Sequence, residues 1–276
     1  MVRDCYIKII VWCLISLLLV FVLFPFYWMF ITSVKDDAEI FAYTPTLFPR
    51  SFTLKHYVTA WVYGKVGVYF KNSLIVAGCT VILSFLVVVP AAFSASLYRT
   101  SGTRAISTFV LALQMFPGIL LLIPLYIVMK KYQLIDTYLA LVVSYSTFTV
   151  PFCLLLTKTY FDNLPRELYE AARIDGCSDF LILWKVAVPL ILPGIMVVGL
   201  FSFVLAWCDF MFAKTFTNTE VTRTITVGLS TLQGSWTVEW GPLMAAASIA
   251  TIPVLVIFSL ANKYIIEGLT AGAVKG

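Results

Sequence analysis

Charged side chains are scarce in this sequence. Only 12% of its 276 residues are Asp, Glu, Lys or Arg, whereas 61% are hydrophobic, and the mean hydropathy is +0.96. Soluble domains carry roughly 25% charged residues, so this composition excludes an ordinary water-soluble fold. The net charge of +5 comes from Lys and Arg residues that are scattered rather than gathered in a basic stripe. A nucleic-acid partner is therefore not expected.

Catalytic and metal-binding motifs are also missing. No Gly-x-x-x-x-Gly-Lys-Ser/Thr loop, which would hold ATP phosphates, occurs in the chain. His56 is the single histidine, so a His-Glu-x-x-His zinc site is excluded, and we expect a solvated loop residue there. The six cysteines are not closely paired, which predicts neither a disulfide framework nor a metal site. They are Cys5, Cys13, Cys79, Cys153, Cys177 and Cys208.

Long charge-free stretches are what the sequence has in abundance. Each is long enough to cross a bilayer, which takes about 20 apolar residues in a helix. A backbone in hydrocarbon must satisfy its own hydrogen bonds, and the alternation of a barrel strand is absent. We therefore predict an all-α polytopic membrane bundle, a single transmembrane domain over 1–276. Its six transmembrane helices are expected at 9–34, 72–98, 105–129, 137–157, 186–208 and 241–262.

Six crossings place both termini on one side of the membrane. The first stretch follows Arg3 and Lys8 as a signal peptide would, but it is too long and lacks a small-residue cleavage site, so it is expected to remain as a helix. Lys and Arg are almost equally frequent in the loops of the two sides. The positive-inside rule therefore does not settle which side is cytoplasmic.

The loop over 158–185 has the pattern of two short helices around a break. Pro165 suits the first turn of a helix, Gly176 can supply a left-handed residue that ends it, and Ser178 can cap a second helix. Spacing of three and four residues places Leu168, Ala171, Ala172 and Asp175 on one face, with Glu170 beside it. Such a face permits close packing of a partner, but a surface helix with local ion pairs has the same pattern.

The same loop carries a resemblance to a known family. Glu170-Ala171-Ala172, then Asp175-Gly176, then Pro189 and Pro193, resemble the EAA loop of ABC importer permeases. The ending over 268–276 and the stretches 53–57 and 72–77 are similar to the six-span subunit of the maltose-type carbohydrate permeases. Cys208 departs from that pattern, because the family usually has Asn after the tryptophan.

The resemblance implies a function and a set of partners. The chain would be a non-enzymatic permease subunit that moves a di- or oligosaccharide across the bacterial inner membrane by alternating access; permeases for glycerol phosphate esters belong to the same family. Its partners would be a second homologous permease, two copies of an ABC ATPase, an extracytoplasmic sugar-binding protein and membrane lipid. ATP and Mg²⁺ would bind the ATPases, and this chain would hold no cofactor.

The resemblance also implies roles for particular residues. The loop would be a cytoplasmic coupling helix seated in a cleft of the ATPase, and both termini would be cytoplasmic. The coupling contacts would come from Glu170, Ala171, Ala172, Asp175 and Gly176. The tail would reach the ATPase pair through Gly268, Gly272 and Lys275.

Sugar recognition needs polar groups and aromatic faces along a water-filled cavity. Candidates for this path are Gln114, Tyr145, Trp207 and Asp209, although polar residues in bundles also serve helix packing and interface anchoring.

Two other classes of protein are alternatives to the permease hypothesis. An intramembrane enzyme needs ionisable groups clustered at one depth, and a secondary transporter usually needs intramembrane carboxylates or inverted repeats. The predicted spans contain no charged residue between their ends.

Overall fold

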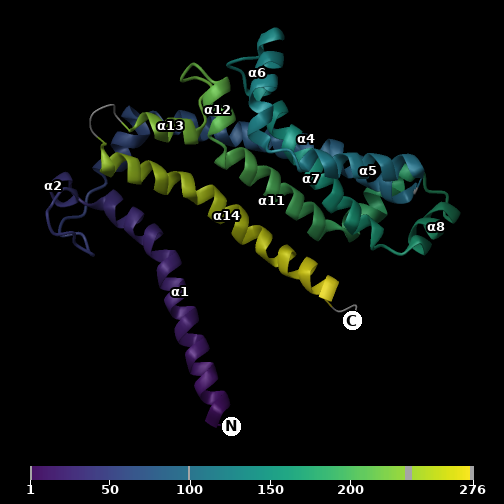
Figure 1. Ribbon diagram of the computed structural model, residues 1–276, viewed down its shortest axis with the longest axis horizontal. Coiled ribbons are helices and arrows are strands. Elements are labelled where there is room, and N and C mark those ends of the chain that lie inside the picture. Colours follow the sequence, from purple (N-terminus) through teal and green to yellow (C-terminus); the bar gives the residue numbers. More distant parts are fainter. Residues whose placement is uncertain (1, 99, 234–237, 274–276) are drawn as a thin grey trace. The chain divides into compact units, whose positions relative to one another are not determined.

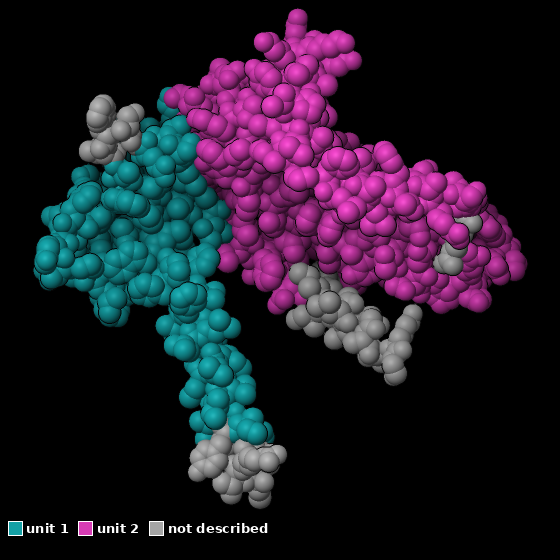
Figure 2. Space-filling model, in the orientation of Figure 1, with its two compact units in different colours: residues 1–67, 228–252 teal, residues 68–227, 253–276 magenta. Residues whose placement is uncertain are grey.

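The structure of the protein is a computed structural model that describes residues 2–98, 100–233 and 238–273, with side chains over 7–98, 100–233 and 238–263. Helices account for every named element in these ranges, which confirms the all-α prediction. The described chain falls into two compact units, residues 1–67 with 228–252 and residues 68–227 with 253–276, coloured separately in Figure 2.

Four helices are long and apolar enough to cross a membrane unaided: α1 (Val2–Val34), α4 (Val66–Leu97), α7 (Tyr138–Asp162) and α14 (Trp240–Ala273). Each contains an internal proline, at Pro25, Pro90, Pro151 and Pro253. A bilayer tolerates such prolines because neighbouring helices and local adjustments satisfy the freed carbonyl groups. These helices extend beyond the predicted apolar spans, since hydropathy marks only the part of a helix that lies in hydrocarbon.

The third and fifth predicted spans are not straight helices. In the third, α5 (Ser101–Gln114) is separated from the turn η2 (Gly118–Leu121) and α6 (Leu122–Lys131) by a bend of 96°. Pro117 lies at this bend, where it lacks an amide proton and disfavours helical geometry before it. The predicted continuous helix over 105–129 is therefore wrong.

The fifth span bends by 84° at Ile191. Before the bend lie α9 (Asp179–Leu181), the π-helical turn η3 (Ile182–Ala187) and α10 (Val188–Leu190); after it lies α11 (Leu192–Cys208). Pro189 and Pro193 flank the bend and account for it physically. Counted with both bent pairs as single spans, the described chain has up to six crossings, in agreement with the predicted number.

Short helices fill the segments between the spans. They are α2 (Asp37–Ile40), α3 (Lys55–Val58), the π-helical turn η1 (Thr59–Tyr63), α8 (Arg166–Ile174), α12 (Met211–Phe216) and α13 (Ile225–Thr231). Within the second unit, α5 and α11 both pack along α7 (Figure 1). Figure 1 places α8 at one end of this unit, well away from α6 and α12.

His56 corrects the expectation of a solvated loop histidine. Only 2% of its surface is exposed, and its Nε2 atom lies 2.8 Å from the carbonyl oxygen of Lys35. The ring packs so closely on Gly241 that a Cβ atom there would lie 2.3 Å from it. Lys35 is buried too, with its ammonium group 4.7 Å above the Trp28 ring. The first loop thus packs against α1 and the start of α14, and this contact between distant segments buries His56.

Candidate coupling and translocation sites

The helix α8 is anchored by its inner face and exposed on its outer face. Tyr169 meets Phe93 of α4 edge-on with 5.7 Å between ring centroids, and Phe93 meets Phe161 of α7 at 5.5 Å. Ala172 joins the same buried cluster. On the outer face Glu170 and Ala171 are exposed. The helix is thus attached to the ends of two membrane-spanning helices while it presents a free surface.

Ala172 corrects the predicted docking face. It was expected to face a partner together with Leu168, Ala171 and Asp175, but only 8% of its surface is exposed because it lies one turn from Tyr169 on the inner face. The other three residues are exposed. The packing of the Tyr169 ring determines which face of α8 turns inward, and helical spacing alone does not predict that choice.

The helix α8 ends, and α9 begins, through the residues that the sequence predicts for these roles. Gly176 has a φ of +81°, in the left-handed region, and the amide of Cys177 donates to the carbonyl of Ala172 over 3.0 Å. These are the features of a glycine-terminated helix. The Ser178 hydroxyl caps α9 by accepting from the amide of Leu181, as predicted. Pro165 caps α8 rather than occupying its first turn.

Two apolar side chains beside this turn were missed by the sequence analysis. Ile174 is 87% exposed and Phe180 is 72% exposed, on either side of Gly176. Large apolar residues exposed side by side mark a surface that contacts either another protein or the membrane. The sequence analysis could have identified this surface from the two large apolar residues in a loop that is otherwise rich in charge.

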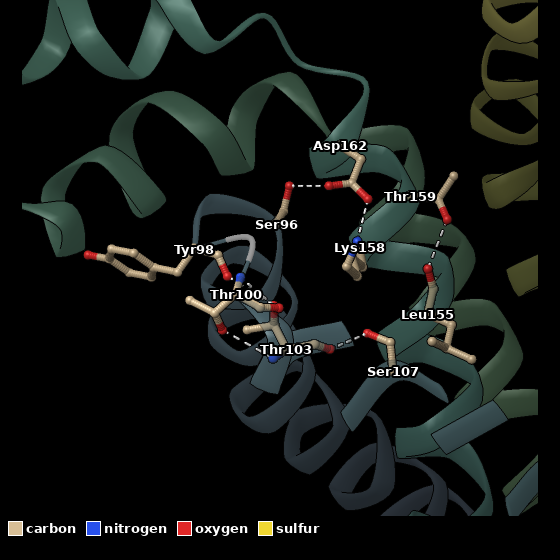
Figure 3. Close-up of polar contacts among 9 residues, drawn as sticks. All are labelled: Ser96, Tyr98, Thr100, Thr103, Ser107, Leu155, Lys158, Thr159 and Asp162. Carbon is tan, nitrogen blue, oxygen red and sulfur yellow. Dashed lines mark hydrogen bonds and ion pairs between the residues drawn. The ribbon is translucent and has the colours of Figure 1, made fainter. Parts of the chain in front are cut away.

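Polar contacts connect the end of α4 with α7. Ser96 donates to the carboxylate of Asp162 over 2.7 Å, and Lys158 forms an ion pair of 2.5 Å with the same carboxylate (Figure 3). The chain then turns at Thr100, whose hydroxyl forms a capping box with Thr103 at the start of α5. The first two contacts hold the end of α4 beside the end of α7, and the capping box fixes the start of α5.

A small cavity of about 90 Å³ lies beside α8. It is lined by Ser96, Leu97, Phe161, Leu164, Arg166, Tyr169, Glu170 and Arg173. The buried hydroxyl of Tyr169 has no hydrogen-bond partner among the described residues. Burial, and then the nearby Asp162 carboxylate, raise the pKa of Tyr169 above its ordinary value.

Three of the four predicted path residues lie around adjoining cavities in the second unit. Gln114 lines a cavity of about 420 Å³, and Tyr145 with Asp209 lines one of about 310 Å³. Phe148 and Leu205 belong to the walls of both cavities. Phe148 was not predicted; its position one turn after Tyr145 on α7 was the signal that could have identified it.

Trp207 does not join this group. Only 2% of its surface is exposed, because it stacks on Phe203 at 5.4 Å and meets Phe70 edge-on at 5.4 Å. It lines neither cavity. Its indole fills the helix packing, and a contact of Trp207 with the sugar path stays a prediction.

The loop after α12 is held by side chains from other elements. The carboxylate of Asp136 accepts from the amides of Asn218 at 2.9 Å and Thr219 at 3.1 Å, and from the hydroxyl of Thr222. Burial opposes the charged form, but these hydrogen bonds prevail and lower the pKa of Asp136 to about 2. Asn72 donates to the carbonyl groups of Val221 and Arg223, each at 2.8 Å.

The predicted tail contact falls largely outside the described side chains. The backbone of Gly268 and Gly272 continues α14 as helix, whereas Lys275 lies outside the described residues. The contact of this tail with an ATPase stays a prediction.

Membrane-length helices, with an anchored and outward-facing helix between two of them, are the architecture of a polytopic membrane protein. Residues 87–270 match the family described as "Binding-protein-dependent transport system inner membrane component", and the chain belongs to this family.

Curated relatives align over almost the whole chain. An inner membrane ABC transporter permease of Escherichia coli strain K12 is 35% identical over 96% of this chain and 95% of its own length. A sulfoquinovosyl glycerol transport system permease of Agrobacterium fabrum is 34% identical over 95% of this chain and 92% of its own. A trehalose/maltose transport system permease of Thermococcus litoralis is 37% identical, with 94% of each chain covered.

A solved structure supports the fold independently. A chain of a bacterial ABC transporter involved in the import of alginate superposes with a TM-score of 0.85, covering 95% of this chain and 98% of that one. The sequence identity is 21%, so this likeness concerns the fold alone.

Proposed function

We propose that this chain is one permease subunit of an ATP-driven importer and that its cargo is a neutral di- or oligosaccharide. The relatives named for trehalose, maltose and sulfoquinovosyl glycerol support a carbohydrate. The cavities at Gln114 and Tyr145 support it too, because they combine aromatic faces with a few polar groups, the usual lining of a small-molecule site.

The charge of the cavity walls argues against glycerol phosphate esters. No Lys or Arg belongs to the described lining of either cavity, whereas Asp209 contributes a carboxylate. A phosphate group in such a place would lack the cationic partner that phosphate recognition ordinarily requires. Gln114 and Asp209 can instead exchange hydrogen bonds with sugar hydroxyl groups, and Phe148 can stack on a sugar ring. Tyr145 is fully buried and acts through Asp209, to whose carboxylate its hydroxyl donates.

The observation that supports the transport mechanism is that α8 packs on α4 with one face and exposes the other. Tyr169 fastens the helix to α4, and Glu170, Ala171 and Ile174 remain outside. We infer that this outer face docks on an ABC ATPase, which binds the ATP and Mg²⁺ that the chain has no motif to hold. In this arrangement α8 and both termini are cytoplasmic.

The remaining partners follow from the same proposal. A second, homologous permease subunit supplies the other half of the translocation path, and two ATPase copies bind the two coupling helices. An extracytoplasmic sugar-binding protein delivers cargo on the opposite side. Alternating access then carries the sugar past Gln114, Tyr145 and Asp209.

An uptake assay tests the proposal. A strain lacking this chain is complemented with the wild type or with Gln114→Leu, and uptake is measured for trehalose, maltose, diacetylchitobiose, sulfoquinovosyl glycerol and glycerol 3-phosphate. We expect the wild type to restore uptake of a sugar from this panel, and Gln114→Leu to raise its half-saturating concentration. Thr159→Val, an exposed α7 position outside both cavities, is the control. Restored uptake confined to glycerol 3-phosphate, or to sulfoquinovosyl glycerol with its anionic sulfonate, would reject the neutral cargo.

A further inference from the structure

Asp179 joins three separate helices at the inner end of the second unit. It is the first residue of α9, and it accepts a hydrogen bond from the hydroxyl of Tyr98, the residue that follows α4. Its other carboxylate oxygen accepts from Arg173 in the last turn of α8, with 2.9 Å to Nη2 and 3.2 Å to Nε. One carboxylate therefore ties α4, α8 and α9 together.

The electrostatics show that the carboxylate is held in its charged form. The hydroxyl of Tyr98 and the guanidinium of Arg173 both donate to this carboxylate, and hydrogen bonds from such donors favour its charged form. Charge-assisted hydrogen bonds of this kind are shorter and more directional than neutral ones. The hydrogen bonds therefore fix the relative orientation of Tyr98, Arg173 and Asp179, and not only the distances between them.

A second, apolar connection reaches the same helix. Tyr169 on α8 packs edge-on against Phe93, about one turn before the end of α4. The two connections grip α8 near its middle and at its C-terminal end. An element attached to a rigid helix at one point can pivot, whereas attachment at two points makes the pair move as one body.

We infer that Asp179 is a positioning residue for coupling: through Tyr98 and Arg173 it makes α4 follow the movement of α8. This inference rests on the proposed function, in which an ATPase moves α8. It goes further by naming α4 as the span that receives the movement and Asp179 as the residue that prevents α8 from pivoting about Tyr169.

The contact can be removed without dismantling the fold. Tyr98, Arg173 and Asp179 are all partly exposed to solvent, and ion pairs in such places contribute little to folding. The aromatic cluster of Tyr169, Phe93 and Phe161 would still hold α8 in place. Loss of Asp179 should therefore change how α8 moves rather than whether the chain inserts or binds its partners.

Distance measurements between spin labels test this directly in the assembled complex. The native cysteines are replaced, and labels are attached after Glu167→Cys in the first turn of α8, outside the proposed docking residues, and after Ser94→Cys on α4, both at exposed positions. Pulsed electron resonance is recorded without nucleotide and with ATP in EDTA, which permits binding but not hydrolysis. We expect one narrow distance peak that stays in place on ATP addition.

Asp179→Asn should replace that peak with a broad distribution that shifts when ATP is added, and Tyr98→Phe should do the same to a smaller extent. Asp179→Glu keeps the carboxylate and should recover much of the narrow peak. ATPase co-purification should remain at the wild-type level in all three, with uptake of the panel sugar reduced several-fold in Asp179→Asn only.

A distribution in Asp179→Asn identical to the wild type, with and without ATP, would overturn the inference. Failure of the unmodified chain to retain an ATPase would instead overturn the proposed function.

Discussion

The hydroxyl of Tyr145 donates a hydrogen bond to the carboxylate of Asp209 across 2.9 Å, joining the middle of α7 to the residue that follows α11. Asp209 also accepts from the backbone amide of Ala213, so it caps the start of α12. A side chain beside the 310 Å³ cavity thus fixes the junction between α11 and α12.

Tyr145→Phe removes one donor and preserves the ring. A hydrogen bond to a charged group contributes about 1.5 to 3 kcal/mol, so the variant should lose thermal stability and raise the half-saturating sugar concentration. Thermal unfolding in detergent and uptake kinetics measure the two effects. Ser146→Ala, whose hydroxyl bonds only to the carbonyl of Val142 in its own helix, is the control. Wild-type values for both quantities in Tyr145→Phe would show that the pair has no role.

Gly176→Val should detach or uncouple the ATPase while leaving the chain inserted. The left-handed φ of +81° imposes a penalty of about 1 to 2 kcal/mol on a residue with a Cβ atom. No atom lies within 4 Å of a Cβ built at this position, so crowding inside the chain does not contribute. Gly176→Asn, which tolerates this conformation, is the matched control and should retain more ATPase on co-purification. Equal, full retention and uptake in both variants would contradict the coupling assignment.

Ile174→Asp should weaken ATPase binding without unfolding the permease, because this side chain is 87% exposed. Burial of such a side chain in an interface contributes about 1.5 to 3 kcal/mol, which corresponds to roughly tenfold or more in affinity. Co-purification across an ATPase titration measures the loss. Ile174→Leu preserves the apolar surface and should bind normally, and Glu170→Ala should have a milder effect than Ile174→Asp. Undiminished binding by Ile174→Asp would place the docking surface elsewhere.

Asp136 should make stability depend on pH. Its folded pKa of about 2 lies below the ordinary value of 3.8, so its contribution is complete above pH 3.8 and is lost as pH falls toward 2. Allowing for solvent screening of this partly exposed group, we expect about 1 kcal/mol. Thermal unfolding should show Asp136→Asn less stable than wild type at pH 7, with the difference shrinking below pH 4. A difference that is constant over this range would rule out the carboxylate as its source.

Truncation after Glu267 should leave membrane insertion intact and impair the coupling of ATP hydrolysis to sugar uptake. The reason is the resemblance of the tail over 268–276 to the ending of the maltose-type permeases. Membrane fractionation and ATP hydrolysed per sugar imported measure the two outcomes. Replacement of Lys275 alone by Ala serves as a control for charge. Normal coupling in the truncated chain would mean that the tail has no part in it.

Several features of this protein could be read from local sequence, since each depends on neighbours along the chain. Charge-free length predicted the number of spans, because a bilayer requires about 20 apolar residues irrespective of tertiary contacts. Gly176 predicted the end of one short helix through its backbone conformation, and Ser178 predicted the start of the next through its capping hydroxyl. The EAA pattern identified the family because its motif is contiguous.

Other features depended on contacts between residues distant in the sequence, and only the tertiary structure decided them. Ala172 faces inward because Tyr169, on the same side of α8, packs against Phe93 of α4. His56 is buried because Gly241 has no side chain and leaves space for the imidazole ring. Trp207 is enclosed by Phe70 and Phe203, which its place at the end of an apolar span did not reveal. Composition and spacing describe which side chains share a helical face, but the packing partner determines which face turns inward.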